Sequence, residues 1–429
     1  MRSVGNQDAR SRPLRNVLLI AFHFPPLKGS SGMQRTLRFA QHLPSFGWRP
    51  VVLTVNPGAH DEIADIQGNE VPAGLTVHRA FCLNAARQLS LFGRYPNFVA
   101  LPDRWASWRL WAVRKALRVI RDERIDALWS TFPLATTHWI GMEVAKRAKL
   151  PWVAEFRDPM WQHDWPVEAT ANRVWRKLER EVVFAADRLV FVAPSAITMY
   201  QERFPELPDA KLSLLENGYD EEVFKRAEQG RPAATTSRAP GPITLLHSGI
   251  IYRSERDPTH FFAAIASLKR RGLLSAATLR IVLRATGDDA GFRAQLQQLD
   301  IDDVVRVEPA IDYLSALREM MAVDGLLILQ AANCNAQIPA KLYEYVRAAR
   351  PILALTDPQG DTSQTLRKLG IGVIARLDSE AEIAQALLTF IEQLASGDAR
   401  CASAATIAAY SRRTQTGQLA ALLNDLVAR

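Results

Sequence analysis

The sequence predicts an α/β protein made of two Rossmann-like domains, each a doubly wound parallel sheet, which face each other across a cleft. Short apolar runs of strand length alternate with helical patterns along most of the 429 residues, a pattern typical of parallel sheets crossed by helices. The alternation stops at residues 228–242, where Pro, Gly, Ser and Thr gather without an apolar period and indicate a linker. It then restarts, so we expect two halves of similar size.

The first half contains six apolar runs short enough for buried strands and longer segments with a helical period. Residues 1–15 precede them and are polar and rich in arginine, so we expect a disordered tail there. The predicted N-terminal domain spans residues 16–227. Its expected strands are 16–22, 49–55, 76–80, 127–130, 152–156 and 189–192, and its expected helices include 33–46 and 105–122.

The second half repeats this organisation after the linker. The predicted C-terminal domain spans residues 243–400, and residues 401–429 form a C-terminal segment. The last helix of that segment, near residues 414–427, can cross back onto the N-terminal domain. The expected strands of this half are 243–247, 278–284, 304–307, 325–329, 351–355 and 372–375.

Cysteine usage and hydropathy exclude several classes of protein. Cys82, Cys334 and Cys401 are far apart and form no CxxC pair, so they predict neither a disulfide framework nor a zinc site and favour a reducing compartment. No apolar run approaches the roughly 20 residues that a membrane-spanning helix needs. We therefore expect a soluble, cytoplasmic protein.

The charge balance points to an acidic partner. The net charge is +8, which favours a nucleic acid, an anionic membrane surface or a phosphorylated substrate. The chain has no zinc finger, no RNP-type aromatic strand and no lysine-rich arm, so nucleic acid is disfavoured. A phosphorylated small molecule or a membrane surface remains.

Two motifs of the first half lie at the ends of strands and contain residues suited to binding ligands. Gly29 and Gly32 follow the first strand and open a helix, where the backbone can approach an anion closely, and Arg35 lies in the first turn. The alternative is a plain strand-to-helix turn. Arg157 and Asp158 end another strand, at the edge where a doubly wound sheet binds ligands, and the alternative there is a structural Arg–Asp pair.

Two motifs of the second half carry positive charge. In the first, Gly249 makes room and Arg253 and Arg256 can contact a phosphate, unless these arginines simply lie in a solvated loop. In the second, Pro339 suits the start of a helix on which Lys341 adds positive charge to the free amides.

Glu344 follows Lys341 by one helical turn and can accept hydrogen bonds from both hydroxyls of a ribose; the alternative is an i,i+3 surface ion pair. Together, the anion-ready turns of the two halves and this carboxylate describe a nucleoside diphosphate held between two domains. None of these motifs contains a DxD triplet, so we expect no metal and no other cofactor, and arginine, lysine and helix dipoles would neutralise the diphosphate. HExxH and GxSxG motifs are absent as well.

At these residues the sequence resembles retaining glycosyltransferases of family 4, which have the two-domain GT-B architecture. The similarity lies in an order of motifs that covers nearly the whole chain after residue 15. The motifs are Phe24 to Arg35, Phe156 to Pro159, Asn217 to Asp220, His247 to Pro258, and Pro339 to Leu353.

The resemblance implies a nucleotide-sugar donor in the second domain and an acceptor in the first. It implies catalytic roles for Arg256 and Lys341 at the diphosphate and for Asp158, and it assigns Glu344 to the ribose. The leaving diphosphate would help to deprotonate the acceptor hydroxyl. The donor-binding set is Gly29, Gly32, Gly249, Arg253, Lys341, Tyr343 and Glu344, and the acceptor-side set is Arg35, Arg157 and Asp158.

Two positions depart from the family pattern. The first of the two family glutamates falls on Ala336, which removes the usual carboxylate contact with the donor sugar. Many relatives carry a histidine where this chain has Arg157 and Asp158.

The segment 105–122 supports a separate hypothesis. Trp105, Trp108 and three smaller apolar residues share one helical face, while arginines and a lysine supply charge elsewhere. Such a helix can lie on an anionic membrane, which would suit a polyprenyl-diphosphate-linked acceptor and a peripheral position on the cytoplasmic face of an inner membrane. The alternative is a core helix with a solvated basic face.

The leading hypothesis is therefore a retaining hexosyltransferase that uses a UDP- or GDP-sugar to build a bacterial exopolysaccharide or lipopolysaccharide. The first alternative is a nucleotide-sugar 2-epimerase, which shares the architecture. The second is a catalytically silent nucleotide-sugar-binding partner of a polysaccharide assembly complex, for which Ala336 is the support. Transfer needs an acceptor, epimerisation does not, and a silent partner does neither.

Overall fold

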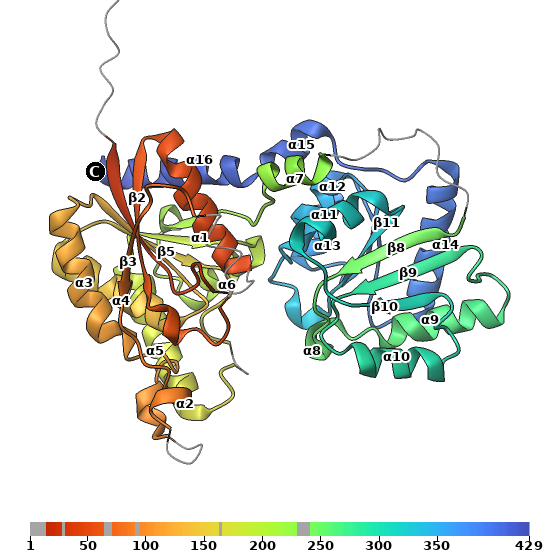
Figure 1. Cartoon of the computed structure of the whole chain (residues 1–429), viewed down its shortest axis with the longest axis horizontal. Helices are drawn as coiled ribbons and strands as arrows, with labels where there is room; N and C mark the ends of the chain where they lie inside the picture. Colours follow the sequence, from red (N-terminus) through yellow and green to blue (C-terminus); the bar gives the residue numbers. More distant parts are fainter. Residues whose placement is uncertain are drawn as a thin grey trace, which may run out of the picture. The chain divides into compact units, whose positions relative to one another are not determined.

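The computed structural model describes residues 14–27, 31–63, 71–90, 95–162, 165–229 and 241–428 (Figure 1). These residues form two compact units. The first unit consists of residues up to 191, residues 204–215 and residues from 416 onward, and the second consists of residues 192–203 and 216–415. Most of the predicted tail and most of the predicted linker lie outside the described residues.

The first unit contains a seven-stranded parallel sheet in the order β3-β2-β1-β4-β5-β6-β7. The strand order reverses at β1, which pairs in parallel with β2 on one side and with β4 on the other: Leu19 lies opposite Val52 and opposite Trp129. The strands are β1 (Arg15–Ile20), β2 (Trp48–Val55), β3 (Thr76–Ala80), β4 (Ala127–Thr131), β5 (Trp152–Phe156), β6 (Arg188–Phe191) and β7 (Leu212–Leu214).

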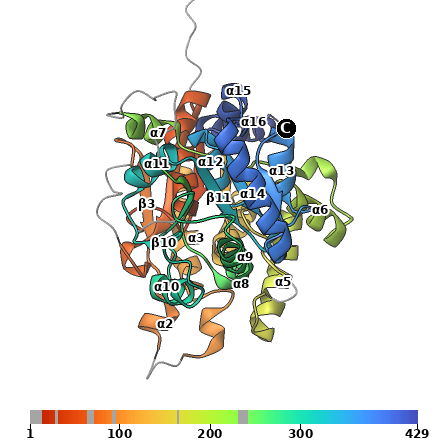
Figure 2. The same cartoon turned by 90° about the vertical axis from the view of Figure 1, so that its right-hand side faces the viewer.

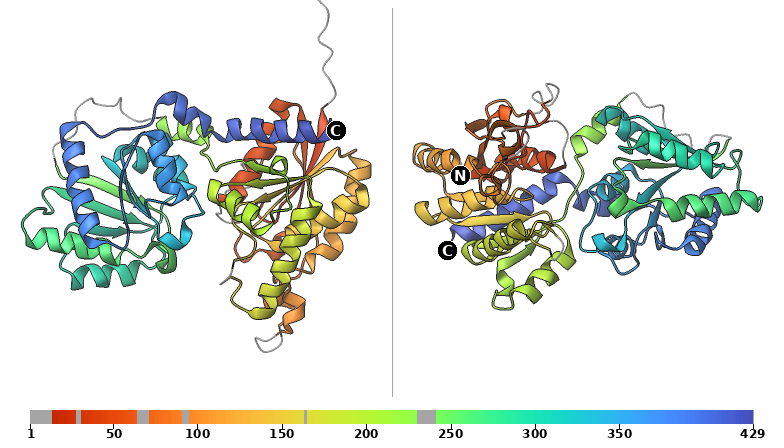
Figure 3. Two further views of the ribbon diagram at one scale, coloured as in Figure 1. Left: turned by 180° about the vertical axis from the view of Figure 1, so that it is seen from behind. Right: turned by 90° about the horizontal axis from the view of Figure 1, so that it is seen from below.

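Helices cover both faces of this sheet. Helices α3, α4 and α5 pack side by side on one face, and α1 and α16 contribute to the core on the other. Figure 3 shows α16 in blue along the first unit. The helices are α1 (Ser31–His42), α2 (Ala85–Gln88), α3 (Trp108–Asp122), α4 (Ala135–Ala148), α5 (Ala169–Ala185) and α16 (Arg412–Val427).

The core of the first unit explains why α16 returns to it. Leu419 and Leu423 are fully buried in the same cluster as Trp48 from β2. The indole Nε1 of Trp48 donates a hydrogen bond of 3.1 Å to Asn424. A Cβ at Gly417 would lie 3.0 Å from the ring of Phe46, so the small residue allows the helix to approach closely.

The second unit contains a six-stranded parallel sheet in the order β10-β9-β8-β11-β12-β13. Its order reverses between β8 and β11. The strands are β8 (Ile243–Ser248), β9 (Leu279–Arg284), β10 (Val305–Glu308), β11 (Gly325–Leu329), β12 (Ile352–Leu355) and β13 (Val373–Ala375).

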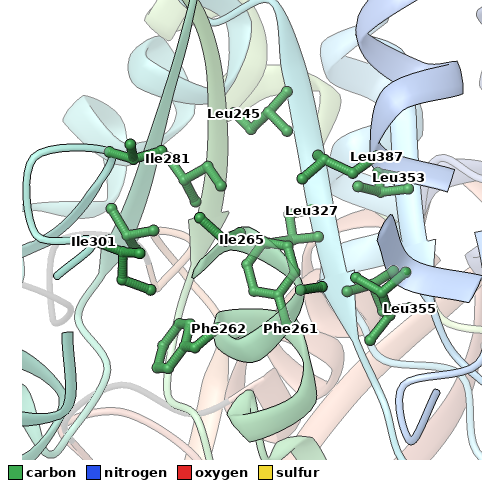
Figure 4. Packing of buried hydrophobic residues seen from close by; sticks show 14 of the residues in the cluster. Leu245, Phe261, Phe262, Ile265, Ile281, Ile301, Leu327, Leu353, Leu355 and Leu387 are labelled. Carbon is green, nitrogen blue, oxygen red and sulfur yellow. The ribbon is translucent and has the colours of Figure 1, made fainter. Parts of the chain in front are cut away.

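Apolar side chains from one face of the second sheet pack against some of its helices. Phe261, Phe262 and Ile265 of α9 meet Leu327 and Leu353 of the sheet in one buried cluster (Figure 4), and α9 lies beside α14 (Figure 2). The helices are α6 (Pro194–Arg203), α7 (Glu221–Glu228), α8 (Arg253–Arg256), α9 (Thr259–Arg270), α10 (Asp289–Gln298), α11 (Tyr313–Ala322), α12 (Lys341–Ala348), α13 (Asp361–Leu369), α14 (Glu380–Ser396) and α15 (Ala404–Ala409).

Helix α6 belongs to the second unit although the strands on either side of it belong to the first. The carboxylate of Asp361 accepts hydrogen bonds from the backbone N–H of Ser195 at 2.9 Å and from its hydroxyl at 2.7 Å. Asp361 is buried, so it ties the start of α6 to α13. The boundaries of the two units therefore differ from the predicted domain boundaries, because α6, which precedes β7 in the chain, belongs to the second unit.

Helix α3 begins later than the sequence suggested and has one buried face. It starts at Trp108 rather than Trp105. Trp108, Ala112, Val113, Ala116 and Val119 are buried against the sheet. Among the described residues, no helix is both long and apolar enough to span a membrane.

Candidate functional site

Two of the predicted motifs meet at the carboxyl edge of the second sheet, where its strand order reverses. Gly249 follows β8 and has a φ of +118°, which side chains other than glycine rarely adopt. A Cβ at this position would lie 3.1 Å from the Nζ atom of Lys341, the first residue of α12. The glycine therefore provides the space that the lysine amino group occupies. Such reversal points are where doubly wound sheets bind ligands.

The Lys341 amino group lies beside a buried histidine. Its Nζ is 3.2 Å from Nε2 of His247, and Nδ1 of the same ring is 3.0 Å from the carbonyl oxygen of Leu327. Burial lowers the pKa of His247 well below its ordinary value, and the charge of Lys341 lowers it further. Burial and the neighbouring Arg256 lower the pKa of Lys341 to about 7. The amino group can therefore change its charge near neutral pH.

Arg256 adds a second positive charge to this group. Its Nη1 donates a hydrogen bond of 2.8 Å to the carbonyl oxygen of Ile250, and its guanidinium carbon lies 5.4 Å from the ring centre of Tyr252. The side chain is one-fifth exposed, at 20%. Burial and Arg256 lower the pKa of Lys341, and two neighbouring cations that are partly open to solvent would gain from an anion between them.

Glu344 occupies the next turn of α12 and contacts a tyrosine rather than Lys341. Its Oε1 accepts a hydrogen bond of 2.6 Å from the hydroxyl of Tyr313, at the start of α11. Burial raises the pKa of Glu344. The alternative of a simple surface ion pair with Lys341 does not describe this arrangement, since each side chain has a different partner.

The structure does not gather every predicted donor residue at this point. Tyr343 is buried on another side of α12, where its hydroxyl donates to Glu216 at 3.3 Å. Arg253 pairs with Asp288 at 3.2 Å and lies over the ring of Phe292.

Arg253 instead lines a neighbouring pocket of about 660 Å³ at the ends of β11, β12 and β13. Arg376, which follows β13, also lines the pocket and pairs with Asp378 at 3.0 Å. The full lining is Arg253, Ser254, Asp257, His260, Gln330, Ala331, Ala332, Asp357, Pro358, Gln359, Arg376, Leu377 and Asp378.

In the first unit, the two predicted motifs also come together. Gly32 opens α1, and a Cβ there would overlap the guanidinium group of Arg157, which follows β5. Burial lowers the pKa of Arg157. Asp158 is partly exposed next to it. Gly29 lies outside the described residues.

Arg35 has a different position from its predicted partners in this unit. It is 1% exposed, and its Nε donates to Oε1 of Glu155 at 2.9 Å. Its Nη2 donates to the carbonyl oxygen of Leu215 at 2.7 Å, and Thr131 donates to the other carboxylate oxygen at 2.9 Å. The guanidinium of Arg35 thus joins α1 to β5 and to the residue that follows β7 inside the unit. These contacts give Arg35 a structural role.

Three polar residues near these motifs were not assigned roles from the sequence. Burial and the charge of Arg157 lower the pKa of His23, just after β1, to about 3. His247 and Tyr313 contact Lys341 and Glu344 as described above. A histidine at the end of an apolar strand is the signal that could have drawn attention to the first two. Nothing in the sequence around Tyr313 marks it.

No metal-binding cluster accompanies the site. Among the described residues, no three His, Cys, Asp or Glu side chains lie close enough together to hold a metal ion.

A domain family and several solved structures are similar to this chain. Residues 31–218 match a family model described as a glycosyl transferase 4-like domain. No curated protein sequence matches the chain.

Solved glycosyltransferase structures match nearly the whole chain. A glycosyltransferase from Rickettsia africae has a TM-score of 0.64 at 11% identity, with 97% of this chain and 99% of that one covered. HepE from Anabaena, in complex with UDP, has a TM-score of 0.64 at 15% identity over 96% of this chain and all of its own. The lipopolysaccharide outer core galactosyltransferase WaaB has a TM-score of 0.59 at 10% identity over 95% and 99%. The predicted fold class and the predicted resemblance to family 4-like glycosyltransferases are confirmed.

Proposed function

We propose that this protein is a retaining glycosyltransferase that transfers a sugar from a UDP- or GDP-sugar to a glycan or a lipid-linked acceptor in bacterial surface polysaccharide biosynthesis. The observation that carries the proposal is the arrangement at the reversal point of the second sheet. There the Lys341 amino group lies over Gly249, within the electrostatic reach of Arg256, and Glu344 lies one helical turn away.

The chemistry follows from these charges. Lys341 and Arg256 would neutralise the diphosphate as its bond to the sugar breaks, which stabilises the leaving group where negative charge develops. The carboxylate of Glu344 would accept hydrogen bonds from the ribose hydroxyls, in place of or beside the hydroxyl of Tyr313. One oxygen of the departing diphosphate would take the proton of the acceptor hydroxyl, so the donor itself supplies the base and the anomeric configuration is retained.

Support for a nucleotide-sugar donor comes from a solved neighbour. HepE was crystallised with UDP and, separately, with UDP-glucose. Support for a polysaccharide role comes from WaaB, whose name places it in lipopolysaccharide outer core synthesis. In the same proposal, Arg157 and Asp158 of the first unit serve the acceptor.

We also propose that the exposed side of α3 lets the protein bind an anionic membrane surface from the cytoplasmic side. Leu110 and Trp111 are exposed there, and the ring of Phe81 lies 4.8 Å from that of Trp111. Arg114 and Arg118 are exposed one and two turns further along the helix. Apolar side chains beside arginines suit the boundary between headgroups and acyl chains.

The experiment that tests the donor site is a thermal-shift screen with UDP, GDP, CMP and ADP. Stabilisation by UDP or GDP should be lost in Lys341→Ala and Glu344→Ala and kept in Lys177→Ala, a lysine variant on the exposed side of α5. Absence of a shift with every nucleotide would reject the donor site. Donor turnover then separates the functions: transfer requires an acceptor, epimerisation proceeds without one, and a silent partner gives no turnover in either case.

A further inference from the structure

The geometry fixes which nitrogen of the His247 ring donates a hydrogen bond. The carbonyl oxygen of Leu327 can only accept, so Nδ1 of His247, 3.0 Å away, carries the proton. Burial and two neighbouring cations, Lys341 and Arg256, keep the ring neutral. Its Nε2 is then an acceptor, and the hydrogen bond of 3.2 Å runs from Lys341 Nζ to His247 Nε2.

This contact solves a positioning problem. A lysine side chain is a flexible four-carbon stem that ends in a compact charge, so a fixed amino group needs a partner. His247 lies in β8 and is fully buried, so packing restricts the motion of its ring. It is therefore a rigid acceptor, and the amino group it holds lies against the backbone of Gly249.

We propose that His247 is a positioning residue for the diphosphate: its Nε2 holds the Lys341 amino group over Gly249, at the place where the diphosphate of the donor binds. The proposal rests on the proposed function and adds to it a residue that touches neither donor nor acceptor. His247 acts through Lys341, while its other ring nitrogen is hydrogen-bonded to Leu327.

A neutral partner has a consequence that a carboxylate partner would not have. The charged groups that face Lys341 are Arg256 from α8 and Glu344 from α12, with His247 uncharged on β8. An ammonium held by a neutral ring keeps its positive charge available to a ligand, whereas a carboxylate would already have neutralised it. The pKa of Lys341 in the free protein is about 7. A bound diphosphate raises this pKa, so the Lys341 amino group takes up a proton when the diphosphate binds. Affinity should be highest below pH 7 and fall as the pH rises above it.

The test uses two variants of the full-length chain that separate the two nitrogens of the ring. In His247→Asn the amide N–H can replace Nδ1 and keep the bond to Leu327, but nothing replaces Nε2. In His247→Gln the amide oxygen can replace Nε2 and keep the bond to Lys341. UDP affinity is measured by calorimetry from pH 6.5 to 9, with Lys341→Ala as the reference that removes the titration of the lysine.

We expect His247→Asn to bind UDP about tenfold more weakly at pH 6.5, as for the loss of one charge-assisted hydrogen bond, and His247→Gln to remain within about threefold of the parent protein. The double variant with Lys341→Ala should bind no more weakly than Lys341→Ala alone. Parent-like binding and pH dependence in His247→Asn would overturn the proposal, because that variant keeps the structural bond. Equal losses in the Asn and Gln variants would overturn it as well.

A second measurement keeps this inference separate from the proposed function. Failure of the parent protein to bind any nucleotide would reject the donor site, but the contact between His247 and Lys341 exists without a ligand. The rate at which the Lys341 amine reacts with an acylating reagent is followed against pH by mass spectrometry, with Lys177 as internal reference. We expect the midpoint to shift in His247→Asn and to stay near the parent value in His247→Gln. An unchanged midpoint in His247→Asn would overturn the contact itself.

Discussion

Replacing Gly249 by alanine tests whether UDP affinity depends on the position of the Lys341 amino group. The structure gives two separate costs. An alanine at a φ of +118° is strained, by about 1–3 kcal/mol of folding stability. Its Cβ would also lie 3.1 Å from Nζ of Lys341, closer than ordinary van der Waals contact, so the amino group has to shift by a few tenths of an ångström from its position over the backbone.

The control for this variant is Gly397→Ala at the end of α14. Gly397 also has a positive φ, +81°, but a Cβ there would meet no atom within 4 Å. It therefore carries backbone strain without a neighbour to displace. Both variants should unfold at lower urea concentration than the parent protein, whereas only Gly249→Ala should lose UDP affinity, by about tenfold or 1.4 kcal/mol. Parent-like UDP binding by a folded Gly249→Ala protein would refute the placement of the diphosphate beside Lys341.

Three further predictions concern the core, the metal and the membrane. Glu155→Ala leaves the guanidinium of Arg35 buried without its carboxylate and should cost about 3–5 kcal/mol in urea unfolding, while Glu181→Ala at an exposed ion pair should change stability by less than about 1 kcal/mol; equal effects would contradict the role assigned to the buried pair. Sugar transfer should continue in EDTA, because Lys341 and the arginine beside it neutralise the diphosphate; loss of activity restored by Mg²⁺ would show that a metal is needed. Trp111→Asp should reduce cosedimentation with anionic vesicles and leave binding of UDP in solution unchanged, and unchanged cosedimentation would exclude α3 as the contact.

The sequence predicted most strands because buried parallel strands are short apolar runs with clear ends. The expected strands at 76–80, 152–156 and 325–329 have the bounds that the structure shows. Strand β7 was missed because it has only three residues, Leu212–Leu214, and none of them is fully buried. So short a strand at the edge of a sheet leaves no period in the sequence.

The site could be predicted only as far as strand ends reveal it. Gly249 and Lys341 were both placed in the donor-binding set, and the structure shows that they follow neighbouring strands of one sheet. The interior position of Arg35 was not predicted, because its partner Glu155 lies 120 residues further along the chain and its burial depends on the assembled unit. For the same reason the sequence named the motif that contains His247 without giving the histidine a role.

The interleaving of the two units along the chain affects how the protein can fold during synthesis. The path passes from the first unit to the second after residue 191, returns after 203, leaves again after 215 and comes back after 415. The sheet of the first unit is translated within the first half of the chain, but part of the cover over Trp48 and its neighbours comes from α16. A nascent chain would therefore carry a partly uncovered apolar face on its first sheet while most of the second unit is being made, and a chaperone that binds exposed apolar surface would have its target there until residues 416–428 leave the ribosome.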